Sequence, residues 1–417
     1  MLVILLVLGL SIGACSRAGD PVVPVTPDTA PPKPPVQDAT TPSPVMAIVD
    51  YSRVDLKEPA VAERFSRADI VVLDMANFWS ASVTEDVVKS LKDRNPRVKV
   101  IGYVNAHDCW LSWGETSDRY HADWYIATRP YWSYTTTGDT MQAWPGKVLV
   151  NVLDPACRSA MIGVLADHLD AYPSRIDGIF WDHFNEQLWV PSDLPGVEGE
   201  MDLDGNGLAH VDDPAEQAAY REASTAMITE ARARLGADVI QIANGNRAAR
   251  DSVFAGLLDG MFYENFPEVG FSGSHYIQAL DPAVPHNLLA ARNWPRTDNG
   301  GPWLILSNKF EFSFWDDSGD MLAYREAEFA RVMALMAGVA VSYHTEQKTR
   351  WGWPEVELAL GAATTEPVRD GQRLTRTFEH GTVSLEYKTG KRPVPFSFTI
   401  VQNGDTVQAF DLPRHVP

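Results

Sequence analysis

Short apolar runs alternate with amphipathic stretches along most of the chain. Runs rich in β-branched residues predict strands at 46–51, 69–75, 98–105, 176–182, 239–244, 259–264, 302–308 and 339–344. Helical patterns separate several of them, at 84–94, 156–170, 214–235 and 320–337. Strands that are almost continuously apolar and alternate with helices indicate a parallel sheet covered by helices on its outer face.

Eight strand–helix units over about 300 residues match a (β/α)8 TIM barrel, which is the α/β fold that we expect for residues 46–358. The alternative is an open doubly wound sheet, but no glycine-rich phosphate loop follows the first strand. Residues 359–417 hold further strand-like runs broken by turn sequences. They predict a small C-terminal β-rich subdomain that supports the barrel.

Each predicted barrel strand ends on a polar residue. These residues are Asp50, Asp74, Asn105, Asp182, Asn244, Glu264, Asn308 and His344. A TIM barrel places all its C-terminal strand ends on one face, around one mouth. Any one of these side chains could simply cap a loop, but the set as a whole predicts a polar site at that mouth.

Two of the strands carry nearly the same phrase. IDGIFWDHFNE occupies 176–186, and LDGMFYENFPE occupies 258–268. Because side chains alternate along a strand, Asp182 lies on the face of Phe180, and Glu264 lies on the face of Phe262. Bulky residues mixed with glycine on that face suit a barrel interior, so both acids should point into the mouth.

The opposite face of these two strands should pack under the helices. Its residues are Ile179, Trp181, Met261 and Tyr263. Asp177 and Asp259 precede the strands, at the far end of the barrel from the mouth, and we expect them to be turn residues.

The phrases DGIFWD and DGMFYE resemble the strand-four and strand-six signatures of TIM-barrel glycoside hydrolases related to the endo-α-1,4-polygalactosaminidases. VLDPACR (152–158) and RTFEHGTV (376–383) are also similar to these families, and the likeness covers residues 46–390. The resemblance implies an acid at the end of strand four, here Asp182, and another after strand six, here Glu264. A long insertion after strand four departs from the family pattern and is expected to reshape the cleft.

Glycoside hydrolysis needs two carboxyl groups, one to protonate the leaving oxygen and one to attack the anomeric carbon or activate water. We assign Asp182 as nucleophile or base and Glu264 as acid, although the roles could be reversed. Other acids are held in reserve: Asp74, Glu186 and Glu268. Candidate substrate-binding residues are Asp74, Asn105, Asn244, Asn308 and His344.

The segment 106–147 is rich in aromatic residues and too long to be a plain connector. On the active face of a barrel, exposed rings such as Trp110 and Trp113 would form sugar subsites, because ring faces stack on the C–H faces of sugars. The alternative is a self-packed loop, and we expect about half of its rings to be buried in that way.

The stretch DLDGNGLAHVDD (202–213) resembles an EF-hand calcium loop. The candidate Ca²⁺ ligands are Asp202, Asp204, Asn206, the Leu208 carbonyl and Asp213. Asp replaces the usual Glu at the last position, and the alternative is an acidic surface turn. We expect the ion to have a structural role.

The N-terminus predicts export. Residues 1–15 form a short apolar run that ends in a lipoprotein-type cleavage box, with Cys15 as the lipidation site, although no Lys or Arg precedes the run. An ordinary secretory signal is the alternative. The proline-rich segment 16–45 is predicted to be a disordered linker.

In an oxidising compartment Cys109 and Cys157 could form a disulfide, or they could be two buried thiols.

The net charge of −20 argues against nucleic acid or an anionic membrane surface as partner. We therefore expect a monomer whose partner is a polysaccharide and whose only membrane contact is a lipid anchor at the bacterial cell envelope. One alternative function is a non-catalytic carbohydrate-binding lipoprotein on the same barrel. Another is a metal-dependent phosphoesterase, which needs a dense His/Asp/Glu cluster at the strand ends, and the sequence shows no such cluster.

Overall fold

The computed structural model describes residues 46–171, 176–184, 188, 200–245, 256–264, 303–309, 319–344, 358–387 and 396–411. Within these, the side chains of 308–309, 319–327, 343–344, 387 and 408–411 fall outside the description. The expected signal peptide, linker and lipidation site (Cys15) also lie outside the described residues, as do Glu186 and Glu268. Among the described helices, none combines the length and the apolar character needed to cross a lipid bilayer.

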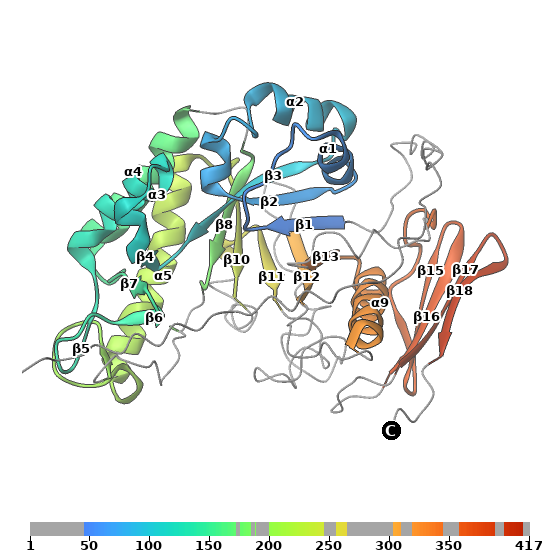
Figure 1. The fold of residues 1–417 in the computed structure, drawn as a ribbon. Coiled ribbons are helices and arrows are strands. Elements are labelled where there is room, and N and C mark those ends of the chain that lie inside the picture. The colour runs from blue at the N-terminus through green and yellow to red at the C-terminus, as the bar shows by residue number, and fades with distance from the viewer. Residues whose placement is uncertain are drawn as a thin grey trace, which may run out of the picture. The chain divides into compact units, whose positions relative to one another are not determined.

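The predicted TIM barrel is confirmed. A closed barrel of parallel strands forms in the order β1-β13-β12-β11-β10-β8-β3-β2 (Figure 1). The strands are β1 (Met46–Asp50), β2 (Ile70–Asp74), β3 (Lys99–Asn105), β8 (Gly178–Asp182), β10 (Ile240–Asn244), β11 (Gly260–Tyr263), β12 (Trp303–Lys309) and β13 (Ala340–His344). Each lies within one or two residues of its predicted position, because β-branched runs bounded by polar residues define strands well.

Helices cover the outside of the barrel in the described parts of the chain. They are α1 (Pro59–Ser66), α2 (Glu85–Arg94), α4 (Pro155–Ala171), α5 (Pro214–Leu235) and α9 (Gly319–Ala337). Asp213 caps α5 by accepting hydrogen bonds from the backbone N–H groups of Ala215 and Glu216 at 2.9 and 3.1 Å.

Strand alternation separates two apolar cores. The inner core consists only of strand residues of one parity, and it includes Phe180 and Phe262. The larger outer core holds the opposite parity together with the helices, and it includes Ile179, Trp181, Met261 and Tyr263. The predicted assignment of both faces is therefore confirmed.

In the repeated phrase, the Asp and the Gly each have their own structural role. A Cβ at Gly178 would collide with the backbone carbonyl of Ile240, and one at Gly260 would collide with that of Trp303. Only glycine lets these strands approach so closely. Asp177 and Asp259 lie at bends directly before their strands, which agrees with the expected turn residues, and each carboxylate also bridges to the start of the neighbouring strand.

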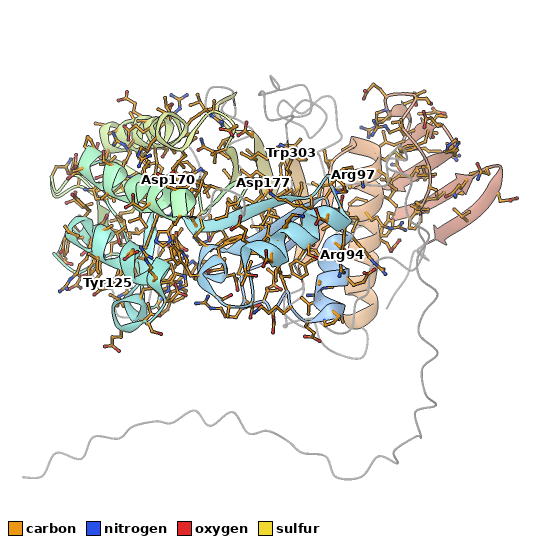
Figure 2. The ribbon with its side chains drawn as sticks, turned by 90° about the horizontal axis from the view of Figure 1, so that it is seen from above. Arg94, Arg97, Tyr125, Asp170, Asp177 and Trp303 are labelled. Atoms are coloured by element: carbon orange, nitrogen blue, oxygen red, sulfur yellow. The ribbon has the colours of Figure 1, made fainter. Side chains whose placement is uncertain are left out.

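These bridges follow one pattern. Asp177 Oδ2 accepts a hydrogen bond from Val100 N–H at 2.7 Å, and its Oδ1 pairs with Lys92 at 2.9 Å. Asp259 Oδ2 accepts from Gln241 N–H at 2.7 Å and from the Arg232 guanidinium at 2.8 Å. A third acid, Asp69, pairs with Arg97 at 2.9 Å. Figure 2 labels Asp177 and Arg97 of this group. The acids fix strand register at the end of the barrel away from the mouth.

A subdomain is inserted between β3 and α4. It contains β4 (Asp108–Trp110), η2 (Leu111–Glu115), α3 (Arg119–Thr128), η3 (Arg129–Tyr131), β5 (Tyr134–Thr135), β6 (Gln142–Trp144) and β7 (Lys147–Leu149). β4, β7 and β6 form a small sheet, and β5 pairs with β9 (Met201–Asp202) from the later insertion. Trp124 and Tyr120 on α3 are fully buried, so the subdomain has a core of its own.

The predicted disulfide does not form, because Cys109 and Cys157 are both free and buried. The Cys109 thiol contacts the Trp110 carbonyl at 3.6 Å, whereas the Cys157 thiol contacts the Met161 sulfur at 3.7 Å. The two sulfurs therefore have separate contacts. Burial raises the pKa of both thiols to about 12, so they stay protonated and unreactive at neutral pH.

The C-terminal β-rich region is also confirmed. Five antiparallel strands run in the order β14-β15-β16-β17-β18, and their bounds are Val368–Asp370, Arg373–Phe378, Gly381–Tyr387, Phe396–Gln402 and Asp405–Asp411. Helix α9 lies against β15 and β16 (Figure 1). Apolar residues of this sheet, including Val383 and Phe398, belong to the same core cluster as the outer layer of the barrel.

Candidate active site

Asp182 and Glu264 meet at one amide. The Asn244 Nδ2 group donates one hydrogen bond to Asp182 Oδ1 at 2.9 Å and another to Glu264 Oε2 at 2.9 Å. The distance between these two carboxylate oxygens therefore cannot exceed the combined length of the two hydrogen bonds. Three residues that the sequence singled out are brought together, with Asn244 between the two acids.

The barrel topology explains this meeting. β10 lies between β8 and β11, and Asn244 shares the inward parity of Ile240 and Ile242. An amide nitrogen has two protons, so it can serve two carboxylates at once. Asp182 and Asn244 are 7% and 6% exposed, and bringing such groups out of water is tolerable only when they are hydrogen-bonded.

Two tyrosines that the sequence analysis missed complete this side of the site. The Tyr103 hydroxyl donates a short hydrogen bond to Asp182 Oδ2. The Tyr51 ring lies 4.5 Å from the Tyr103 ring, centre to centre. Burial raises the pKa of both phenols, and the charge of Asp182 raises it further, so both remain hydrogen-bond donors. Strand alternation could have revealed them, because both continue an inward-facing row.

A second group of polar residues adjoins Asp182. His183 Nε2 lies 3.9 Å from Asp182 Oδ2, and His183 Nδ1 lies 3.5 Å from Asp108 Oδ2. The Lys147 ammonium reaches the same Asp108 oxygen at 3.0 Å, and Asn105 donates to the other one. Asp108 is 1% exposed, so it is a buried carboxylate that lies beside a cation and two polar side chains.

His183 has an unusual backbone. Its φ of 51° lies in the left-handed region, which costs about 1 kcal/mol or more for a residue other than glycine. The conformation turns the chain directly after β8 and holds the ring between two carboxylates.

Charge distribution favours an ionised Asp182. Burial raises the pKa of this carboxyl, but His183, Lys147 and the hydrogen bonds from Tyr103 and Asn244 outweigh burial, so the pKa is lowered overall. Burial lowers the pKa of His183, but Asp182 and Asp108 outweigh burial, so this pKa is raised overall. An ionised carboxylate held by neutral donors suits a nucleophile or base.

The other predicted binding residues have mixed outcomes. Asn105 holds Asp108, as described above. Asp74 caps η1 (Met75–Trp79) by accepting from Ala76 N–H at 2.8 Å, and it lies 3.4 Å from His121 Nε2. Asn308 is the next-to-last residue of β12 and His344 ends β13, but their side chains are outside the described set. A role in sugar binding stays a prediction for all of these.

The aromatic rings of 106–147 divide between core and surface. Trp110 is 38% exposed, and Trp113 is partly buried, with its ring stacked 4.0 Å from that of His121. The Lys147 ammonium lies 5.7 Å from the centre of the Trp110 ring, which links Trp110 to the polar group at Asp108. Trp110 is therefore the better placed of the two proposed sugar-binding rings.

The loop 202–213 folds around its first aspartate. Asp202 accepts hydrogen bonds from the N–H groups of Gly205, Asn206 and Gly207 at 2.7 to 3.1 Å. Gly207 has a φ of 83°, which explains glycine at the sixth position of the loop.

The carboxylates of this loop converge. Asn206 Nδ2 contacts both Asp204 and Asp213, at 3.1 and 2.6 Å. Glu216, which the sequence analysis missed, joins Asp202 and Asp204 in a group whose ligand atoms lie within 4.8 Å of one another. An acid in the first turn of the following helix was the available signal. A ligand role for the Leu208 carbonyl stays a prediction.

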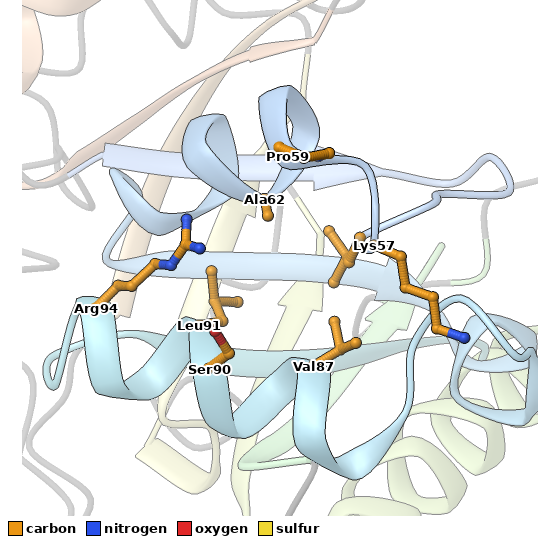
Figure 3. A pocket seen from close by; sticks show the side chains of 8 residues that line it. Lys57, Pro59, Ala62, Val87, Ser90, Leu91 and Arg94 are labelled. Carbon is orange, nitrogen blue, oxygen red and sulfur yellow. The ribbon is translucent and has the colours of Figure 1, made fainter. Parts of the chain in front are cut away.

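A surface pocket of about 290 Å³ lies elsewhere, between α1 and α2 (Figure 3). It is lined by Leu56, Lys57, Pro59, Ala62, Val87, Ser90, Leu91 and Arg94. No carboxylate lines it, so it cannot supply the acid–base chemistry that the strand ends offer.

Comparisons with solved structures give distant similarities. An α-galactosidase from Lactobacillus brevis is 9% identical with a TM-score of 0.46, and the match covers 84% of this chain and 46% of that one. An α-amylase from Lactobacillus plantarum is 12% identical with a TM-score of 0.44, covering 88% and 97%. This chain spans about half the length of the α-galactosidase. No curated protein sequence matches the chain.

A closed (β/α)8 barrel with paired acids at the ends of its fourth and sixth strands has the architecture of a glycoside hydrolase. The family comparison agrees with that class. Hypothetical glycosyl hydrolase family 15 matches residues 92–382, which is more than half of the chain, and the protein belongs to this family.

Proposed function

We propose that this protein is an extracytoplasmic glycoside hydrolase that cleaves O-glycosidic bonds of a polysaccharide with Asp182 and Glu264. The observation that carries the proposal is the Asn244 amide, which holds an oxygen of each acid at 2.9 Å. Two carboxyl groups at this spacing can act on opposite sides of one glycosidic bond.

The spacing favours a retaining reaction. Retaining enzymes hold their carboxyl groups about 5 to 5.5 Å apart, whereas inverting enzymes leave about 6.5 to 9.5 Å for a water molecule. The oxygens that share Asn244 can lie no further apart than two 2.9 Å bonds together, which is shorter than the inverting range.

The reaction then has two steps. Glu264 protonates the leaving oxygen while Asp182 attacks the anomeric carbon, which gives a glycosyl-enzyme ester. Glu264 next takes a proton from water, and that water displaces Asp182 from the sugar. Tyr103 and Asn244 orient Asp182 through the hydrogen bonds that hold it.

The substrate and the location are further parts of the proposal. The likeness of the two strand phrases to the polygalactosaminidase-related families supports a polymer that contains amino sugars. The N-terminal sequence supports a lipid anchor at Cys15, and fractionation of a Cys15→Ser variant tests the anchor. A non-catalytic carbohydrate-binding protein is the competing function, and loss of turnover in the variants below distinguishes the two.

The test is turnover by the full chain on amino-sugar-containing bacterial polysaccharides. Asp182→Asn and Glu264→Gln keep the side-chain shape, and each should lower kcat by about 1,000-fold or more. Asp50→Asn is the matched control, because Asp50 also ends a barrel strand but accepts hydrogen bonds from nearby Ser52. Circular dichroism should show that all three variants fold.

An activated aryl glycoside separates the two roles. Its good leaving group needs little protonation, so Glu264→Gln should lose less activity on it than on the polymer, while Asp182→Asn should lose both alike. Proton NMR of the first-formed sugar should show retention at the anomeric carbon. Normal turnover in both variants would show that the two acids are not catalytic and that the repeated phrase serves only the packing of the barrel.

A further inference from the structure

His107, Asp108 and His183 form a compact group beside the carboxylate pair. One ligand atom from each lies within 4.8 Å of the others. His107 lies two residues after β3, Asp108 begins β4, and His183 directly follows β8, which is the neighbour of β3 in the barrel. The barrel thus brings three metal-ligating side chains together at one point, beyond two adjacent strand ends.

His107 is one of the buried side chains that have no hydrogen-bond partner among the described residues. It is 1% exposed, and neither ring nitrogen has a hydrogen-bond partner among the described residues. Buried polar groups are nearly always paired, and each exception calls for an explanation.

His183 has the orientation of a metal-binding imidazole. Its Nδ1 faces Asp108 at 3.5 Å, while its Nε2 faces Asp182 at 3.9 Å. A histidine that ligates a metal commonly directs its other ring nitrogen to a carboxylate, which fixes the ring and makes it a stronger ligand. Asp182 stands in that position relative to His183.

We propose that His107, Asp108 and His183 bind a divalent transition-metal ion of the zinc class. Two imidazoles and one carboxylate are the ligands that such ions prefer, whereas the all-oxygen group around Asp202 suits a harder ion such as Ca²⁺. Three protein ligands leave a coordination position open. A sugar hydroxyl or water can occupy it, immediately beside Asp182.

The Lys147 ammonium would compete with a metal ion for the Asp108 carboxylate. This ammonium lies 3.0 Å from Asp108 Oδ2 and is 3% exposed, so an incoming ion must share Asp108 with it or displace it. His183 lies between Asp108 and Asp182, so the charge of Asp182 can help to balance both cations. The proposal therefore makes a distinctive prediction, namely that removing the lysine charge strengthens metal binding.

The experiment is titration of chelator-treated, tag-free full chain with Zn²⁺ by calorimetry and with Co²⁺ by visible absorption. The expected result is one equivalent bound, with a Co²⁺ ligand-field band. His107→Gln and His183→Gln should each weaken binding by about 100-fold or more, since loss of an outer partner alone costs 10- to 100-fold. Lys147→Met should tighten it by about tenfold.

Asp204→Ala is the control, because it alters the other acidic group and should leave Zn²⁺ affinity unchanged. The Co²⁺ spectrum needs no variant, so the proposal can fail even if a histidine variant does not fold. Absence of binding to the wild-type chain overturns the proposal. So does binding that persists unchanged in His107→Gln or disappears in Asp204→Ala. None of these readouts depends on glycosidase activity.

Discussion

At the scale of single residues, the site depends on neutral donors that hold a charged acid. Asp182 receives hydrogen bonds from Tyr103 and Asn244 while it lies almost entirely out of water. Such charge-assisted bonds are stronger than bonds between neutral groups. Tyr103 should consequently matter to catalysis although it transfers no proton in the proposed reaction.

We expect Tyr103→Phe to lower kcat by about 10- to 100-fold. A hydrogen bond to a charged group contributes about 1.5 to 3 kcal/mol, and each 1.4 kcal/mol changes a rate tenfold. Tyr120→Phe is the matched control, because Tyr120 is also buried but its hydroxyl has no partner among the described residues. Steady-state kinetics on one substrate compares them, and equal losses in the two variants would contradict a specific role for Tyr103.

At the scale of elements, acids at the strand starts fix the register of the barrel. Asp259 is fully buried and joins the backbone of β10 to Arg232 on α5. A slip of one residue would reverse every side chain of a strand between the two cores. These acids keep Asp182 and Glu264 directed inward from the opposite end of the strands.

Asp259→Asn should lower the free energy of unfolding by about 2 to 3 kcal/mol. The loss is smaller than the 3 to 5 kcal/mol typical of a broken buried pair, because Arg232 is partly exposed. Urea denaturation measures it. Asp170→Asn is the control (Figure 2), since Asp170 is 74% exposed and lies 3.9 Å from Arg234. That variant should change stability by less than about 0.5 kcal/mol, and a comparable loss in both would refute the register role.

The loop 202–213 carries a prediction about calcium. A ligand that binds only the folded state stabilises it, by about 2.7 kcal/mol at one hundred times its dissociation constant. Ca²⁺ should therefore raise the melting temperature of chelator-treated protein, and Asp204→Ala should abolish the rise. Mg²⁺ at the same concentration is the control ion, because it prefers a more rigid octahedral site. Identical melting with and without Ca²⁺ would leave the loop as an acidic turn.

At the scale of the whole molecule, the sequence predicts the barrel well. It does not predict which residues that are distant in sequence come into contact. Periodicity is local, so the strands, their inward faces and the pair Asp182 and Glu264 could all be predicted. Lys147 reaches Asp108 only because β7 folds back antiparallel to β4, with Trp110 opposite Lys147. No local pattern sets such a contact.

The disulfide prediction failed for the same reason. Spacing along the chain does not give the direction of a side chain, and the thiols of Cys109 and Cys157 point into separate surroundings. The metal-ligating group was missed because it draws on two strand ends that are distant in sequence. Residues next to the predicted strand ends, not only the last residue of each strand, deserve inspection in such barrels.

The C-terminal sheet and the barrel should unfold as one unit. Phe396 of the sheet packs on Phe329 of α9, with ring centres 5.1 Å apart. Arg376 of β15 donates to the Leu335 and Met336 carbonyls at 2.8 and 2.9 Å, where α9 ends. The guanidinium thus satisfies carbonyls that the helix itself cannot pair.

Arg376→Met should lower the free energy of unfolding by about 3 kcal/mol, because it leaves buried carbonyls without donors. Arg373→Met is the control on the same strand, since Arg373 is exposed and contacts only Ser384 among the hydrogen bonds described. Tryptophan fluorescence and far-ultraviolet circular dichroism should follow one coincident urea transition in the wild-type chain. Two separate transitions would show that the sheet is an independent domain, and an unchanged midpoint in Arg376→Met would show that its contact with α9 contributes nothing to stability.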